Sequence, residues 1–167
     1  INGLGNENVT ITGDASVSIA AVNGILAATS GIVTAELTGT AAALDAALTN
    51  AKATDALALT VTGPSTAANL LALDNKTSVV VNASAVKEIT GSAAELKTIY
   101  ASKTISGLGN EAVTITDPTP FASADAVNAI LKATTGKVTA TVTTSTDAKA
   151  LNADLKDAKA TDALKLT

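Results

Sequence analysis

The chain lacks most of the side chains that perform chemistry in proteins. Its 167 residues contain no Cys, His, Met or Trp, and every basic residue is Lys. Without His and Cys there is no imidazole base and no thiolate nucleophile. A Ser–Lys pair or paired carboxylates stay open as catalytic groups, although Ser, Thr and Lys here occupy repeated positions that also serve structural needs. We therefore expect no catalytic residues, no cofactor and no enzymatic activity.

Aromatic residues are equally scarce, and the net charge is mildly negative. Tyr100 and Phe121 are the only aromatic residues, too few to line a sugar-binding array, and Tyr100 lies on an apolar helical stripe that predicts a place in the core. The net charge of −4 argues against nucleic acid as a partner, because phosphate binding needs clustered basic residues. No apolar run reaches the roughly 18 residues that cross a bilayer, so we expect no membrane span.

What the chain does contain is a long repeat. INGLGNE returns as ISGLGNE 104 residues later, and VTIT and AKATDAL return at similar offsets. The copies occupy residues 1–7 and 105–111, 9–12 and 113–116, and 51–57 and 158–164. Sequences that copy themselves in this way are typical of stacked arrays. Because the chain opens within a repeat, we expect it to be a piece of a longer protein.

Strand-like and helix-like segments alternate within each repeat. Short β-branched runs, several alternating with Thr, predict strands with one buried face. These runs are residues 9–12, 32–37, 57–61, 79–81, 113–116, 138–142 and 164–167. Apolar residues at helical spacing lie between them and predict helices with one narrow buried stripe. The stripes are Val22/Ile25/Leu26, Leu44/Leu48, Leu96/Ile99/Tyr100, Val127/Ile130/Leu131 and Leu151/Leu155.

The ends of the predicted helices carry their own signals. Ser92 and Glu95 have the spacing of a capping box, which predicts a helix start. Gly31 and Gly136 follow predicted helices, at a position where a left-handed residue is common.

Cutting the chain before each principal strand gives six coils of one strand and one helix. Their bounds are 1–31, 32–56, 57–78, 79–104, 105–136 and 137–163. We predict an α/β fold, a right-handed strand–helix solenoid with a parallel β-sheet on one side and helices on the other. Residues 1–104 form the first four-coil repeat, and residues 105–167 form a partial second repeat of the same continuous solenoid. The alternative is a doubly wound α/β domain, which does not require later strands to copy earlier ones.

Several motifs resemble a known type of repeat. They are GLGNEAVT at 107–114, ATDAL at 53–57, LDNKT at 73–77, and NASAV at 82–86 leading into ITGSAAEL at 89–96. The chain resembles the Ala/Thr-rich tandem repeat regions of very large bacterial secreted and cell-surface proteins, familiar from marine cyanobacteria. The resemblance implies an extracellular or cell-surface location and a multi-copy region, and it implies no catalytic residues.

The acidic residues and the Gly-Leu-Gly-Asn turns are the weak candidates for ligand sites. Asp14 and Asp117, and Asp55 and Asp162, recur between repeats, but calcium needs six to eight converging oxygens and no Asp-x-Asp pattern is present. We therefore expect no metal site and predict turn and capping roles for these four residues. The turns lack the third glycine of a dinucleotide loop, so we expect tight turns in which Asn6 and Asn110 satisfy backbone groups.

Threonine pairs are the one suggestive surface pattern. They lie at 10/12, 60/62, 114/116 and 139/141/143, and residues 79–81 and 105–107 interrupt the series. We predict a structural repeat module of a surface layer, sheath, stalk or adhesin, which assembles with itself or with adjacent repeats of the same chain. The alternative is an extracellular module that binds glycan or protein through the sheet face, with ice binding as a minor variant. Thr is also a common strand residue on an exposed face.

Overall fold

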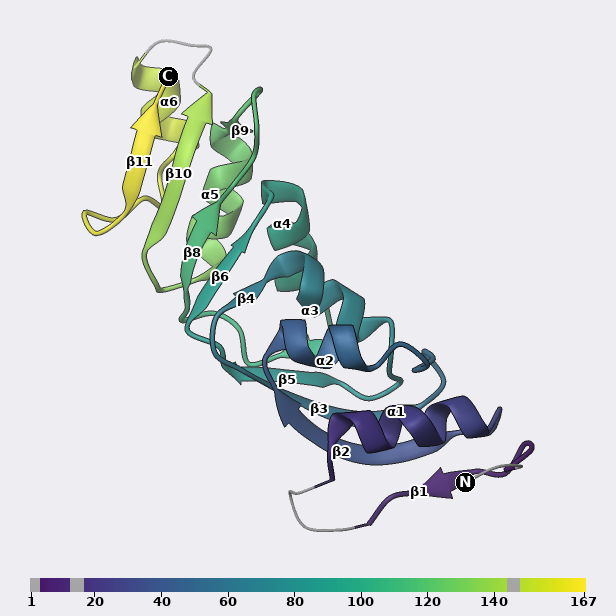
Figure 1. The fold of residues 1–167 in the computed structure, drawn as a ribbon. Coiled ribbons are helices and arrows are strands. Elements are labelled where there is room, and N and C mark those ends of the chain that lie inside the picture. The colour runs from purple at the N-terminus through teal and green to yellow at the C-terminus, as the bar shows by residue number, and fades with distance from the viewer. Residues whose placement is uncertain (1–3, 13–16, 144–147) are drawn as a thin grey trace.

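The computed structural model describes residues 4–12, 17–143 and 148–167 as an elongated mixed α/β structure (Figure 1). Within these residues there are six helices and eleven strands. The helices are α1 (Ile19–Ala28), α2 (Ala41–Ala47), α3 (Ala67–Asp74), α4 (Ala93–Ala101), α5 (Ala124–Ala133) and α6 (Ala148–Asp154). The strands are β1 (Val9–Thr10), β2 (Val33–Gly39), β3 (Ala56–Thr62), β4 (Ser65–Thr66), β5 (Val81–Ala85), β6 (Glu88–Gly91), β7 (Ile105–Ser106), β8 (Ala112–Ile115), β9 (Ala122–Ser123), β10 (Val138–Thr143) and β11 (Ala163–Leu166).

All strand pairs are parallel, and they form two sheets. The first sheet, sheet A, has the order β1-β2-β3-β5-β7, and the second, sheet B, has the order β4-β6-β8-β10-β11. The short strand β9 pairs with β10 beside β8. In both sheets the spatial order of the strands follows the order of the chain, and each strand pairs with the equivalent strand one coil later. A parallel sheet with helices is the predicted class of fold.

The sequence predicted one parallel sheet, whereas the structure has two parallel sheets with a corner between them. Between β5 in sheet A and β6 in sheet B, the Val86 amide donates to the Ala83 carbonyl at 3.0 Å and the Val86 side chain is buried. The register of β3 against β5 also shifts between Thr60 and Thr62. This corner divides one strand into two short ones. Its only sequence signal is an interruption of the alternation around Ala85 and Val86.

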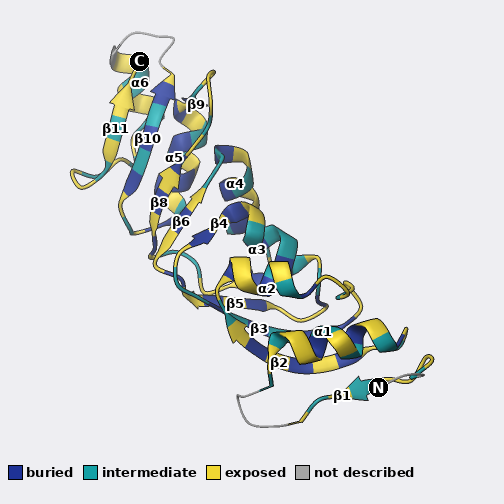
Figure 2. Ribbon diagram, viewed as in Figure 1, coloured by how far each residue is buried: buried dark blue, intermediate teal, exposed yellow. Residues whose placement is uncertain are grey.

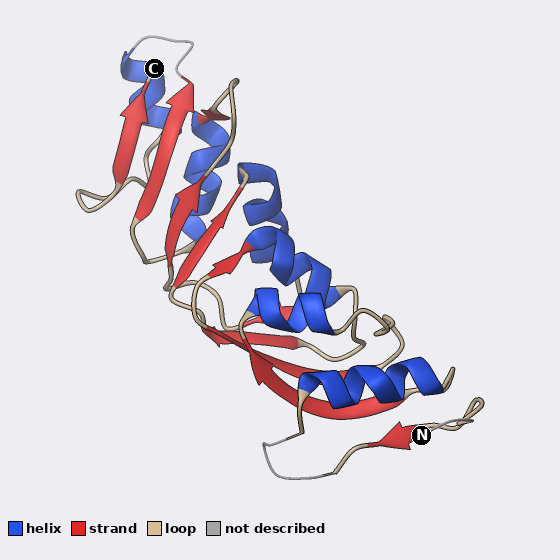
Figure 3. Cartoon of the chain, viewed as in Figure 1, coloured by secondary structure: helices blue, strands red, loops and turns tan. Residues whose placement is uncertain are grey.

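The helices lie in a row along the sheets (Figure 3). Each helix contacts the next one along the chain, from α1 to α6. Five of them begin directly after a Ser or Thr whose hydroxyl accepts a hydrogen bond from the backbone three residues later, which satisfies an otherwise unpaired amide. These capping residues are Ser18, Thr40, Thr66, Ser92 and Ser123. At Ser92 the Glu95 side chain completes the capping box, as the spacing predicted.

The core is a single cluster of Ala, Val, Leu and Ile that extends from Val22 to Val142. Along β2 and β10, buried residues alternate with more exposed ones, so one face of each strand lies against the helices (Figure 2). The helical stripes supply the other half of the cluster, and Tyr100 packs against it, as predicted. Small aliphatic side chains fill the narrow space between sheet and helices without large rings.

Candidate functional site

The polar contacts between successive coils are the best-formed feature outside the core. We call the group built on Asp55 the first clasp. The Asp55 carboxylate is fully buried, and it accepts hydrogen bonds from the backbone amides of Val33 at 2.9 Å and Lys52 at 2.8 Å. Lys52 in turn donates from its ammonium group to the Thr29 carbonyl at 3.2 Å. The carboxylate thus ties the start of β2 to the start of β3.

The same arrangement recurs in the second repeat, and we call it the second clasp. Asp162 accepts from the amides of Val138 at 2.8 Å and Lys159 at 2.7 Å. The Lys159 ammonium donates to the carbonyls of Thr134 at 2.9 Å and Gly136 at 3.1 Å. Equivalent Asp, Val, Lys and Thr residues therefore make equivalent hydrogen bonds in the two clasps. The repeated sequence thus places the same side chains in the same contacts.

Thr77 performs a related task one coil further on. Its hydroxyl receives a bond from the Leu57 amide at 3.0 Å and donates toward the Leu57 carbonyl at 2.7 Å. Ser78 adds a backbone bond to the Asp55 carbonyl at 2.8 Å. Each coil start is thereby held to the coil before it by side chains as well as by the strand pairing.

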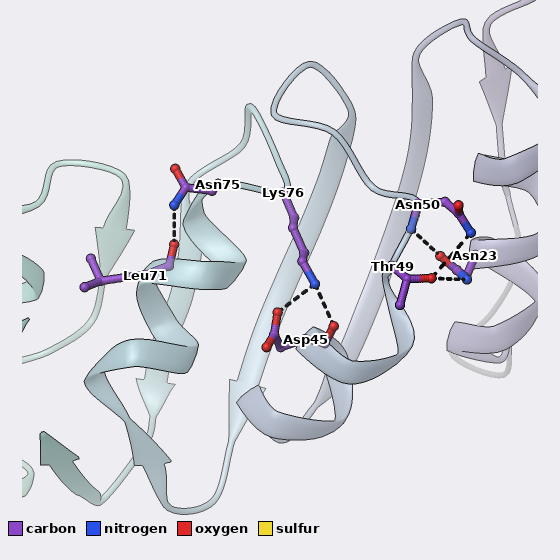
Figure 4. Close-up of polar contacts among 7 residues, drawn as sticks. All are labelled: Asn23, Asp45, Thr49, Asn50, Leu71, Asn75 and Lys76. Atoms are coloured by element: carbon purple, nitrogen blue, oxygen red, sulfur yellow. Dashed lines mark hydrogen bonds and ion pairs between the residues drawn. The ribbon is translucent and has the colours of Figure 1, made fainter.

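Polar residues on the helices and in the loops that follow them also connect successive coils (Figure 4). The side-chain carbonyl of Asn23 accepts a hydrogen bond from the Asn50 backbone amide at 2.9 Å. The side-chain amide of Asn23 donates a hydrogen bond to the Thr49 hydroxyl at 3.1 Å. Lys76 forms an ion pair with Asp45 at 2.6 Å. Asn128 and Asp157 repeat the Asn23 contact in the second repeat, with the Asp157 amide donating at 3.0 Å.

Glu111 forms a third kind of contact, which we call the buried-glutamate turn. The Glu111 side chain is fully buried, and its carboxylate accepts from the backbone amides of Gly109 at 2.9 Å and Asn110 at 3.0 Å. The Tyr100 hydroxyl at the end of α4 donates to the same carboxylate. Burial, and then the hydrogen bond and the negative charge of Glu111, raise the pKa of Tyr100 well above its usual range. The Tyr100 hydroxyl therefore keeps its proton and donates a hydrogen bond to this carboxylate.

This turn corrects one prediction and shows a residue that sequence reasoning missed. The turn amides are satisfied by the Glu111 carboxylate rather than by an Asn side chain. The signal that could have identified Glu111 was its place in the repeated GLGNE motif, which is otherwise made of turn residues.

The prediction that Gly31 and Gly136 adopt a left-handed conformation is also wrong. The glycines with positive φ among the described residues are Gly5, Gly63, Gly107 and Gly109. Gly31 and Gly136 are required by close approach instead. A Cβ atom would lie 2.2 Å from the Glu7 carbonyl oxygen at Gly31, and 2.1 Å from the Glu111 carbonyl oxygen at Gly136.

The four acidic candidates do not come together. Asp55 and Asp162 lie in separate clasps, and Asp117 accepts from the Ala93 amide at 3.2 Å. Asp14 lies outside the described residues. In the described part of the chain, no group of three or more Asp, Glu, His or Cys is placed to hold a metal ion. For Asp55, Asp117 and Asp162 the bonds to backbone amides agree with the predicted capping role.

Threonines form a row across the outer face of sheet B, and a mixed row of threonine and other polar residues crosses sheet A. In sheet B, the strand pairing places Thr66 beside Thr90, Thr90 beside Thr114, and Thr114 beside Thr139. In sheet A, the pairing aligns Thr38, Thr60, Asn82 and Ser106. The sequence pairs included only some of these residues, because Thr66 and Thr90 stand alone in the sequence and are aligned only by the register.

Membrane crossing finds no support among the helices that the structure describes, since none of them is both long and apolar enough. Comparisons with protein-family models, with curated proteins and with solved structures found no match to this chain.

Proposed function

We propose that this chain is a strand–helix solenoid that serves as a structural repeat module of a secreted or cell-surface bacterial protein. The observation that carries the proposal is the recurrence of the clasp, in which Asp55 and Asp162 make the same backbone bonds one repeat apart. Bonds of this kind fix the position of one coil on the next. A protein that repeats them along its length sets a distance between its ends, which is the task of a stalk, sheath, surface layer or adhesin.

The order of the elements supports the same proposal. Strand order in each sheet follows chain order, and each helix contacts its successor. Stacked parallel strands advance about 4.8 Å per coil, so each added coil lengthens the module by a constant step. A doubly wound domain would instead reverse its strand order at one point. We propose that the solenoid is right-handed, because strand–helix–strand connections between parallel strands are right-handed in nearly all proteins.

The proposed location and partners rest on the sequence. The resemblance to Ala/Thr-rich tandem repeats of large bacterial surface proteins favours the extracellular side of the cell. The proposed partner is the same kind of coil, from adjacent repeats or from another copy, because stacked coils bury each other's apolar edges.

The test is to look for assembly and for ligand binding in the same preparation. Sedimentation velocity and electron microscopy across a concentration series, together with a glycan array, would distinguish the two functions. A structural module gives ordered or end-to-end assemblies without added ligand and no saturable glycan signal. Saturable binding by a protein that stays monomeric at every concentration would overturn the structural proposal.

The alternative is a binding module, and the threonine rows are the observation that favours it. Thr66, Thr90 and Thr114 are exposed on neighbouring strands of sheet B, with hydroxyl groups one strand spacing apart. A hollow on the outer face of sheet A adds an irregular surface, lined by Glu36, Thr38, Ala58, Thr60, Val80 and Asn82. Regular hydroxyl rows suit glycan or protein partners, and ice as the minor variant.

This alternative has a matched pair of variants. Thr114→Lys places a charge in the middle of the sheet B row, whereas Thr98→Lys places the same charge on α4, away from the row. Binding that uses the row, measured by glycan array or by thermal hysteresis for ice, is lost in Thr114→Lys and kept in Thr98→Lys. Equal effects of the two substitutions would argue against the row as a binding surface.

A further inference from the structure

The GLGNE turn occurs twice in the chain, and the two copies differ in one respect. Around Glu111 the carboxylate is fully buried and holds the Tyr100 hydroxyl. Around Glu7 the side chain is exposed, and the bonds described for the Glu111 carboxylate have no counterpart among the described residues. Among the described residues, the glutamate of this motif thus binds a tyrosine hydroxyl in one repeat and is exposed in the other.

On the side that faces the following coil, the two turns are built alike. The Thr29 hydroxyl donates to the Glu7 carbonyl at 2.6 Å, and the Thr134 hydroxyl donates to the Glu111 carbonyl at 2.8 Å. The Ser30 amide donates to the Gly5 carbonyl at 2.9 Å. The matching bond in the second repeat joins Thr135 to Gly109 at 2.8 Å. The framework that positions the glutamate is therefore present at Glu7 as well.

The adjoining strands show the same asymmetry. β8, which follows Glu111, pairs with β10 on one side and with β6 on the other. β1, which follows Glu7, pairs with β2 and is the end strand of sheet A. Among the described residues, no element takes the place beside β1 that residues 79–104 take beside β8. In the described part of the chain, one edge of β1 carries no strand partner, and the exposed Glu7 precedes this strand by two residues.

We infer that the turn at residues 4–7 and the edge of β1 form a docking site for another coil of this same repeat, one whose helix ends in a tyrosine as α4 does. The inference rests on the proposed function, since it specifies what stacks on this end of the module. The recognition chemistry is that of the occupied copy. A parallel strand pairs with β1 as β6 pairs with β8, and a tyrosine hydroxyl donates to the Glu7 carboxylate.

The experiment adds a coil to the chain and measures the ionisation of the tyrosine in that coil. A copy of residues 79–104 is joined directly before Ile1, which reproduces the natural junction of Thr104 with Ile105. The chain has one Tyr, so the extended chain has two. Absorbance near 295 nm reports the ionisation of each, and an exposed tyrosine titrates at about 10.

The expected result is that neither tyrosine of the extended chain ionises between about pH 9 and 11, because the docked coil covers Glu7 and each tyrosine hydroxyl then donates to a buried carboxylate. An absorbance change near pH 10 of half the size expected for two ionising tyrosines would mean that the added tyrosine is exposed to solvent. That outcome overturns the inference, whether the added coil is undocked or unfolded, because Tyr100 serves as the internal standard.

A substitution assigns the effect to the carboxylate. Glu7→Ala in the extended chain is expected to restore the ionisation of the added tyrosine near pH 10 and to leave Tyr100 unchanged. Glu36→Ala, which removes an exposed carboxylate elsewhere in the first repeat, is expected to change neither tyrosine. If the added tyrosine still does not ionise near pH 10 after Glu7→Ala, the role of Glu7 is overturned. The sedimentation and glycan experiments use the unextended chain, so a failure of docking is distinguishable from a failure of the proposed function.

Discussion

At the scale of single residues, the chain uses a few polar side chains to satisfy backbone groups where coils meet. Asp55, Thr77 and Glu111 are all buried, and each makes two or more bonds to backbone amides or carbonyls. Buried polar groups are stable when they are hydrogen-bonded and costly when they are not. These residues should therefore be sensitive to substitution because of the backbone groups that they satisfy.

Asp55 and Asp162 provide a matched comparison of burial. Asp55→Ala leaves the amides of Val33 and Lys52 without acceptors in a dry environment, and should lower the free energy of unfolding by about 3 kcal/mol. Asp162→Ala removes the same two bonds at a half-exposed position, where water replaces the carboxylate, and should cost about 1 kcal/mol. Urea unfolding followed by circular dichroism measures both. Equal losses would show that burial does not control the strength of the clasp.

Two glycines make opposite predictions for the same substitution. Gly24 lies inside α1 with open space around its Cβ position, and Ala129 occupies the equivalent place in the second repeat. Gly24→Ala should stabilise the protein by about 0.5–1 kcal/mol. Gly136→Ala would place a Cβ atom against the Glu111 carbonyl and should destabilise by about 2–3 kcal/mol. Thermal unfolding of the two variants tests the pair, and a lower melting temperature for Gly24→Ala would contradict the account.

At the scale of elements, each helix depends on its cap and each strand on its register. The capping box at α4 illustrates the first point. Hydrogen bonds from the Ser92 backbone and then from its hydroxyl lower the pKa of Glu95. A lowered pKa in the folded state means stability that is present above the pKa of the unfolded chain, about 4.3, and lost as the pH falls through the folded value.

The prediction is a cap whose contribution depends on pH. Ser92→Ala should cost about 1 kcal/mol at pH 7 and less at pH 3, where a larger share of the Glu95 carboxylate is protonated. Ser18 caps α1 with no acidic residue in the first turn, so Ser18→Ala should cost a similar amount at both pH values. Urea titrations of both variants at the two pH values make the comparison. A Ser92→Ala penalty that does not change with pH would contradict the capping-box explanation.

The elements themselves were predictable because their signals are local. The alternation in residues 32–37 and the stripe of Val127, Ile130 and Leu131 correspond to β2 and to the buried face of α5. The corner at Val86 was not predicted, because the brief interruption of the alternation around Ala85 and Val86 does not distinguish a corner from the end of a strand. Register was equally hidden, since the alignment of Thr66 with Thr90 depends on coil lengths that vary by a few residues.

The candidate site could be predicted only in part. The repeated Asp55 and Asp162 indicated capping roles, and the structure gives each two backbone partners. The partner of Glu111 is a tyrosine eleven residues earlier on another element, which no local pattern indicates. The close approach at Gly136 also depends on a contact across coils, so the sequence favoured the commoner explanation of a left-handed glycine.

At the scale of the whole molecule, the account depends on coils that follow one another in space as they do in the chain. Clasps, helix contacts and threonine rows all arise from that order, and so does the proposed growth of the module by added coils. An array of this kind gains stability from each neighbour, so the two ends should open before the middle.

The most direct measurement is a series of spin-label distances across sheet B. The chain has no Cys, so pairs of cysteines can be introduced and labelled without background. Labels on Thr66/Thr90, Thr66/Thr114 and Thr66/Thr139 span one, two and three strand spacings, about 5, 10 and 14 Å between backbones. The account predicts a dipolar coupling that weakens steadily across the series. A coupling for Thr66/Thr139 as strong as that for Thr66/Thr90 would show that the strands are not stacked in chain order, and would contradict it.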